Sequence, residues 1–132
     1  MRILLDTSAY SALMRGHDEV ADRVRRAERV VLSAVVAGEL MLGFRLGSRL
    51  RANVAQLDAF LDNPYVSLVP VTLTTADRFA RIAAALRAKG QPIPTNDIWI
   101  AAHTMETGAE LLSFDAHFGA VDGLAWVPLT RT

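Results

Sequence analysis

Residues 2–8 read RILLDTS, an apolar run that stops at a carboxylate followed by two hydroxyls. The apolar part, residues 3–5, is continuous rather than alternating, which is typical of a strand covered by helices on both faces. Asp6 follows directly on this strand, so its side chain is expected at the strand's carboxyl end. The stretch therefore predicts a central, buried strand that ends in an acid.

Further apolar stretches follow and alternate with segments of helical periodicity. The expected strands are residues 3–5, 30–32, 66–69, 110–114 and 125–129. The expected helices are residues 18–29, 34–44, 49–61, 74–89 and 95–107, which carry apolar residues at helical spacing. Gly90 and Gly108 stand where the last two helices need a left-handed residue to end. This order predicts an α/β fold with a mostly parallel sheet covered on both sides.

The composition fits one folded domain spanning residues 1–132, because 52% of the residues are hydrophobic and the length leaves no room for a second core. No run of about eighteen uncharged apolar residues is present, and the first residues lack the apolar region of a signal peptide. We therefore expect a cytoplasmic protein that does not bind membranes. The chain has no cysteine, which excludes disulfides and thiolate zinc sites.

Charge is unevenly distributed although the net charge is zero. Residues 15–51 contain eight Arg and five acidic residues, a balance of +3, whereas residues 91–132 contain one Arg and five acidic residues, a balance of −4. Solvated helix faces explain such a bias. The alternative explanation is a cation-binding site beside an anion-binding surface.

Acidic residues recur at one predicted edge of the sheet. Asp6 and Asp115 follow expected strands. Glu39 borders the apolar stripe of the helix over residues 34–44, and Asp97 lies in the first turn of the last helix, on its inward face. Sites in open parallel sheets form at the carboxyl ends of the strands, where the strand order reverses. We therefore expect these four carboxylates to converge.

Each of these acids also has a purely structural explanation. Asp6 can cap a helix that starts there, and Glu39 can reach solvent from a helix flank. Asp97 can favour the positive end of a helix dipole, and Asp115 can stabilise a turn. Four carboxylates brought together, however, repel one another unless a cation neutralises them. Magnesium and manganese take oxygen ligands and support phosphodiester hydrolysis, which makes them the natural counterions.

Four segments resemble sequence blocks of PIN-domain ribonucleases, and most closely those of VapC toxins from bacterial VapBC toxin–antitoxin pairs. They read ILLDTSAY (3–10), LSAVVAGELMLG (32–43), TNDIWIAAH (95–103) and LLSFDAHF (111–118), in the order and spacing of that family. The resemblance implies a three-layer α/β/α PIN-like domain with a mostly parallel five-stranded sheet. It carries the family's metal-binding and catalytic acids over to Asp6, Glu39, Asp97 and Asp115. Thr7 and Ser113 match hydroxyl positions beside the metals of similar proteins.

The same resemblance implies an activity and partners. The expected activity is that of a magnesium-dependent endoribonuclease, with manganese able to substitute, that leaves 5′-phosphate and 3′-hydroxyl ends. Such a protein acts as the toxin of a type II toxin–antitoxin pair, and its RNA substrate is expected to be of the tRNA or rRNA class. A cognate VapB-like antitoxin is expected to place its C-terminal segment in the site groove, and the chain is expected to form a homodimer.

RNA backbone phosphates need cationic partners, and the arginine-rich part of the chain offers them. The candidates are Arg23, Arg25, Arg26, Arg29, Arg45, Arg49 and Arg51. Residues 45–60 also place apolar side chains at helical spacing, which either pack in the core or supply contact area to a partner. They are Leu46, Leu50, Val54, Leu57 and Phe60.

Two other classes of protein also fit parts of the pattern. Haloacid-dehalogenase-like phosphatases and receiver domains place an Asp after the first strand, as nucleophile or phosphoacceptor. This chain has Ser8 where that phosphatase family has its second Asp, and it lacks a Lys near the last strands for either class. The second alternative is a non-catalytic interaction domain that keeps the fold, although all four acids are retained.

The remaining singular residues are expected to have structural roles. His17, His103 and His117 lack the spacing of a zinc site, and His117 is expected to shape the turn after the last acid. Trp99 and Trp126 are expected in the core or in an interface.

Overall fold

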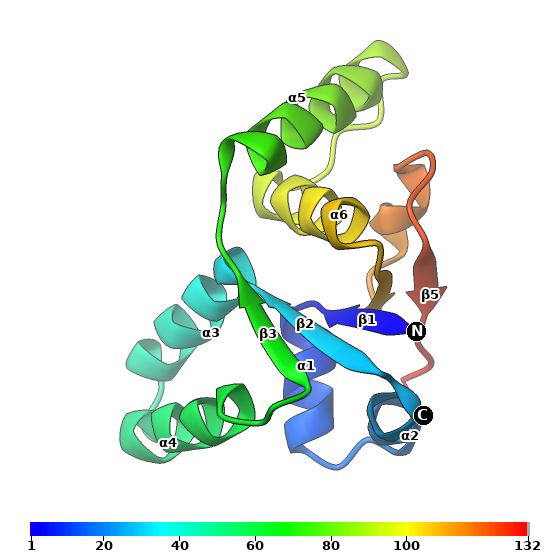
Figure 1. The fold of residues 1–132 in the computed structure, drawn as a ribbon. Coiled ribbons are helices and arrows are strands. Elements are labelled where there is room, and N and C mark those ends of the chain that lie inside the picture. Colours follow the sequence, from blue (N-terminus) through cyan, green and yellow to red (C-terminus); the bar gives the residue numbers. More distant parts are fainter. Residues whose placement is uncertain (132) are drawn as a thin grey trace.

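The computed structural model describes residues 1–131, and within them a five-stranded parallel sheet forms the centre (Figure 1). The strands are β1 (Arg2–Leu5), β2 (Arg29–Ser33), β3 (Val66–Val69), β4 (Glu110–Ser113) and β5 (Trp126–Pro128). They lie in the order β3-β2-β1-β4-β5, and every neighbouring pair is parallel. The prediction that the first strand is central is confirmed.

Helices cover both faces of the sheet, as the predicted three-layer arrangement requires (Figure 1). One face carries α1 (Thr7–Met14), α2 (Asp18–Arg26), α3 (Ala34–Leu46) and α4 (Leu50–Leu61). The other face carries α5 (Leu73–Ala88) and α6 (Thr95–Thr107), and the short 3₁₀ helix η1 (Ala116–Ala120) connects β4 to β5. Across residues 1–131, every helix is too short or too polar to cross a membrane.

One expected helix is shorter than predicted. The segment over residues 18–29 leaves the helical conformation after Arg26, because Ala27 is extended (φ −77°, ψ 141°) and the Glu28 amide donates to the Met1 carbonyl at 2.9 Å. Arg29 therefore begins β2, where its Cα lies opposite that of Arg2. Pairing with β1 overrides the helical periodicity of this arginine-rich segment.

The core is built from the central strands and the helices on them. Five apolar side chains of β1 and β4 are at most 1% exposed: Ile3, Leu4, Leu5, Leu111 and Leu112. A second apolar cluster joins α5 to α6, and there Trp99 stacks on Phe79 with the ring centroids 3.9 Å apart. The start of α6 is therefore held by α5 as well as by the sheet.

Buried hydrogen bonds of His103 hold the second half of α6 against the sheet. His103 is fully buried, with Nδ1 2.7 Å from the Ser33 hydroxyl and Nε2 2.9 Å from the Pro70 carbonyl oxygen. Its role is structural, as predicted. Gly108 ends α6 in the left-handed conformation (φ 65°), also as predicted.

The strand order reverses between β1 and β4. The chain runs outward from β1 to β2 and β3, and then returns to place β4 on the other side of β1. Helices leaving two such strands diverge and open a crevice at the carboxyl edge. Asp6 follows β1 and Asp115 follows β4, so the topology brings both acids to this crevice.

Candidate active site

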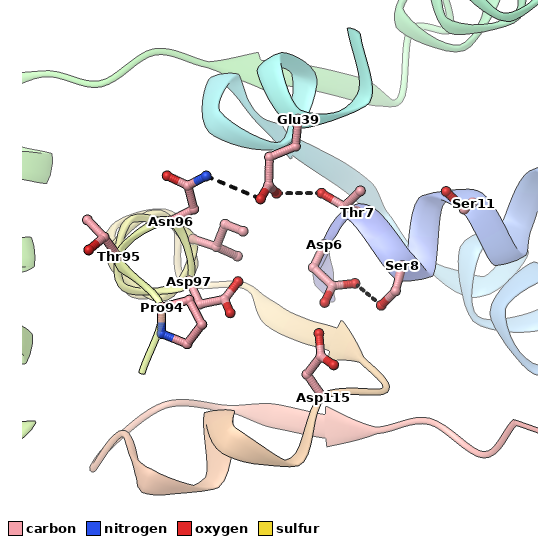
Figure 2. A pocket seen from close by; sticks show the side chains of 11 residues that line it. Asp6, Thr7, Ser8, Ser11, Glu39, Pro94, Thr95, Asn96, Asp97 and Asp115 are labelled. Atoms are coloured by element: carbon pink, nitrogen blue, oxygen red, sulfur yellow. Dashed lines mark hydrogen bonds between the residues drawn. The ribbon is translucent and has the colours of Figure 1, made fainter. Parts of the chain in front are cut away.

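All four predicted acids line one cavity of about 620 Å³ at the carboxyl edge of the sheet (Figure 2). They come from four segments that are far apart in the sequence. The lining residues are Asp6, Thr7, Ser8, Ser11, Glu39, Pro94, Thr95, Asn96, Asp97, Ile100 and Asp115. This lining contains no Lys, Arg or His, so its only ionisable groups are carboxylates.

Asp6 is both a helix cap and a site residue. Its Oδ1 accepts from the Ala9 amide at 2.8 Å and from the Ser8 hydroxyl at 2.9 Å, and its Oδ2 accepts from the Ser113 hydroxyl. The capping interpretation is therefore confirmed, but it does not exclude a second role. The side chain is 3% exposed, and this burial raises the pKa of the carboxyl, with a smaller contribution from the negative charge of Asp115.

Glu39 joins the two helices on either side of it. The Thr7 hydroxyl at the start of α1 donates to Oε1 at 2.6 Å, and the Asn96 amide in the first turn of α6 donates to Oε2 at 3.3 Å (Figure 2). The two hydroxyls predicted beside the acids therefore each contact one of them, Thr7 on Glu39 and Ser113 on Asp6. These contacts fix where the carboxylates point.

Asp97 contacts a histidine. Its Oδ2 lies 2.6 Å from Nε2 of His117, which η1 places against the first turn of α6. Burial raises the pKa of Asp97, the nearby His117 opposes that shift, and the negative charges of Glu39 and Asp115 add to it. Burial, with a smaller contribution from neighbouring carboxylates, therefore raises the pKa of two of the four acids.

Asp115 precedes η1 but does not cap it through its side chain. Its backbone amide donates to the Ser113 hydroxyl at 3.0 Å, and its carboxylate points into the cavity (Figure 2). The turn-stabilising explanation is thus not supported for this side chain. Its electrostatic effect on both Asp6 and Asp97 places it within the same charged cluster.

The chemistry of this donor set fits a divalent cation of the magnesium type. Carboxylates and hydroxyls are hard oxygen ligands, and the lining that holds the four carboxylates contains no basic side chain. Within residues 1–131, however, no three Asp, Glu or His side chains already lie close enough together to hold an ion. An ion of this type keeps several of its waters and needs only one or two carboxylates as direct ligands.

The arginines predicted to hold RNA do not line this cavity. Arg23, Arg25 and Arg26 lie in the last turn of α2, which leads to the amino end of β2, and Arg29 begins that strand. Arg25 and Arg26 approach Asp22 at 3.7 and 2.7 Å, and Arg23 approaches Glu19 at 3.8 Å. The remaining candidates, Arg45, Arg49 and Arg51, are exposed around the turn from α3 to α4.

Among the side chains at the site that the sequence did not predict, two contact an acid from another segment. His117 was expected only to shape a turn, yet it contacts Asp97, and Asn96 contacts Glu39. The available signals were weak: Asn96 directly precedes one acid, and His117 follows Asp115 by two positions. Neither spacing indicates a contact with an acid from another segment.

A parallel sheet that gathers four carboxylates over a cavity at its carboxyl edge defines an α/β protein with an acidic site. The PIN domain family model matches residues 3–124 of the chain. The chain belongs to the PIN-domain family.

Individual relatives agree with this assignment. The chain is 27% identical over 128 residues to Ribonuclease VapC5 of Mycobacterium tuberculosis, covering 97% of this chain and 93% of that protein. Among solved structures it is similar to a chain of VapBC2 from Rickettsia felis, bound to a promoter DNA fragment, with a TM-score of 0.86 and 20% identity over 98% of this chain and 100% of that one. VapBC-5 from Mycobacterium tuberculosis, a member of the VapBC family of toxin–antitoxin systems, has a TM-score of 0.73 and 26% identity over 97% of each chain. The predicted PIN-like fold is confirmed.

Proposed function

We propose that this chain is a magnesium-dependent endoribonuclease that serves as the toxin of a VapBC-type pair. The observation that carries the proposal is the convergence of Asp6, Glu39, Asp97 and Asp115 on one cavity without a basic side chain in its lining. The ribonuclease name of the VapC5 relative supports the reaction class. The substrate proposed is a cellular RNA of the tRNA or rRNA class, and the compartment is the cytoplasm, where such RNAs are abundant.

The four carboxylates would hold Mg²⁺ or Mn²⁺, which when bound would activate water and stabilise negative charge on a phosphoryl oxygen. The chain's own groups orient these ligands. Ser113 and the Ala9 amide hold Asp6, Thr7 and Asn96 hold Glu39, and His117 holds Asp97. Hydrolysis adds water to phosphorus and breaks its bond to the 3′ oxygen, which gives the expected 5′-phosphate and 3′-hydroxyl ends.

Incubation with labelled RNA and with a generic phosphomonoester, each with magnesium or with chelator, tests this function. RNA cleavage that requires magnesium and disappears with chelator is the expected result, with the phosphomonoester unchanged. Hydrolysis of the phosphomonoester alone would favour a haloacid-dehalogenase-like enzyme instead. No reaction with either substrate would favour an interaction domain. Sequencing the 5′ ends of cellular RNA fragments after induction then identifies the RNA that is cut.

The proposed protein partner is a VapB-like antitoxin, because the similar solved structures are VapBC complexes. The surface next to Glu39 offers apolar contact area: Met41, Leu42, Leu46, Leu50 and Val54 are between 37% and 80% exposed. Of the segment predicted for such contacts, Leu57 is instead buried and Phe60 packs edge-on against Tyr10. The partner surface is therefore confined to α3 and the first half of α4.

An antitoxin of this kind is expected to place an arginine among the carboxylates, as a charge-assisted substitute for the cation. Co-expression with a VapB-like neighbour should restore growth and yield a stable complex. Asp97→Asn should weaken that complex by about tenfold, the loss expected for a hydrogen bond to a charged group. Light scattering of the chain alone tests the proposed homodimer. If no neighbouring gene product binds, the toxin assignment fails while the nuclease proposal stands.

A further inference from the structure

A second cavity, of about 410 Å³, lies beside the acid pocket. Residues 91–93 line this cavity and residues 94–97 line the acid pocket, so the two share one continuous stretch of chain. His117 lines the second cavity while its Nε2 contacts Asp97 in the first. The His117 side chain therefore stands between the two spaces.

The second cavity has the opposite charge character. Its lining consists of Lys89, Gln91, Pro92, Ile93, Ala116, His117, Gly119 and Ala120, without a carboxylate. Lys89 supplies an ammonium group, Gln91 an amide and His117 an aromatic ring with a ring nitrogen. An ammonium with amide donors recognises phosphate oxygens, and a flat ring beside Pro92 and Ile93 accommodates a base.

Lys89 is available to a ligand although it has an ion-pair partner. Its Nζ lies 3.0 Å from Oδ1 of Asp122, whose side chain is 84% exposed. An ion pair with so exposed a carboxylate contributes little to stability, because water and salt screen it. A backbone phosphate of RNA carries the same single negative charge as Asp122 and is also held by the other contacts of the strand, so it can replace Asp122 as the partner of Lys89.

We propose that this second cavity binds the RNA nucleotide next to the bond cleaved in the acid pocket, with Lys89 contacting its phosphate. The proposal rests on the proposed ribonuclease function and gives the RNA strand a path from Asp97 past His117 to Lys89. This path replaces the one expected along the arginines of α2. Asp122 competes with the RNA backbone for Lys89.

The test measures RNA binding by fluorescence anisotropy, in an Asp6→Asn background with magnesium so that the RNA stays intact. The probe is a short labelled single-stranded RNA of mixed sequence. Lys89→Ala is expected to weaken binding by about tenfold and to make the salt dependence shallower by about 0.7, the value for one phosphate contact on a single strand. Arg87→Ala, which removes the same charge from the last turn of α5, should change the affinity by less than about twofold, because Arg87 lines neither cavity and screening weakens its attraction.

A charge change of opposite sign provides the second arm. Asp122→Asn should strengthen RNA binding, and this gain should vanish when Lys89→Ala is also present, whereas Asp77→Asn on α5 should give no gain. Equal effects of Lys89→Ala and Arg87→Ala, or a gain from Asp122→Asn that persists without Lys89, would overturn the proposal. Labelled RNA is offered to the parent protein with magnesium in parallel: a parent that still cuts RNA confines any such failure to the second cavity, whereas a parent that cuts no RNA rejects the ribonuclease function together with this proposal.

Discussion

Replacing Asp6 with asparagine is expected to abolish RNA cleavage while the fold survives. Asn is about as good a helix cap as Asp, so the bond from the Ala9 amide can persist and α1 keeps its start. The negative charge that a divalent cation requires is lost, however. The rate of cleavage should fall by about a hundredfold to a thousandfold, the order of loss seen when one group that stabilises transition-state charge is removed. Single-turnover cleavage of labelled RNA measures the loss, and circular dichroism checks the fold.

Asp62→Asn is the matched control, because Asp62 ends α4 on the surface and does not line the cavity. It should cut RNA at the parent rate. Glu39→Gln and Asp97→Asn should resemble Asp6→Asn, and Asp115→Asn is expected to lose less, because the family resemblance is loosest at that position. An Asp6→Asn protein that cuts RNA as fast as the parent would leave Asp6 with capping as its only role.

The second large effect is expected in stability: without metal, the contribution of Asp6 and Asp97 to the free energy of unfolding falls as the pH rises, and magnesium removes this decline. Asp6 and Asp97 have raised pKa values in the folded protein, so the folded state binds their protons more tightly than the unfolded state does. The contribution of these groups to the free energy of unfolding is therefore present at low pH. It is lost as the pH rises from the ordinary Asp pKa of about 3.9 through the raised folded values. Denaturant unfolding at a series of pH values, with chelator, measures this decline.

Magnesium should remove the decline, because the ion binds the ionised carboxylates of the folded state. At a concentration of about a hundred times the dissociation constant, it should add about 2.7 kcal/mol to the free energy of unfolding. Asp6→Asn should reduce both the decline without metal and the gain with metal, while Asp62→Asn should alter neither. If magnesium does not change the free energy of unfolding of the parent protein at neutral pH, this pocket is not a cation site.

The strands that carry Asp6 and Asp115 could be predicted because the sequence patterns that indicate them are local. The continuous apolar run at residues 3–5 indicates a strand that is buried on both faces, and β1 is the central strand of the sheet. The position of Asp6 and Asp115 just after strands then suffices to bring them together, since parallel strands share a carboxyl edge. The sequence indicates helix α1 only through the possible cap at Asp6, because its eight residues make little more than two turns and give a short periodic pattern.

Contacts that depend on how distant segments fold back could not be predicted. His117 reaches Asp97 only because η1 turns toward the first turn of α6, and nothing near either residue encodes that approach. The predicted end of the helix over residues 18–29 was wrong for a related reason. Charge content shows that Arg25 and Arg29 lie in a basic segment, but only strand pairing decides that Arg29 begins β2. Helical periodicity and strand pairing competed there, and the sequence pattern favoured the wrong one.

Binding of manganese, followed by electron paramagnetic resonance of the free ion, tests most directly whether the four carboxylates form a divalent cation site. The measurement needs neither the RNA substrate nor the antitoxin. When manganese is added to the chelator-treated parent protein, the signal of the free ion should decrease because the protein binds it. Magnesium should restore the signal, because it competes with manganese for the same carboxylates. Asp6→Asn should leave the signal of the free ion unchanged, while Asp62→Asn should behave as the parent does. A parent protein that binds no manganese, or an Asp6→Asn protein that binds it equally well, would contradict the assignment of this pocket as the metal site.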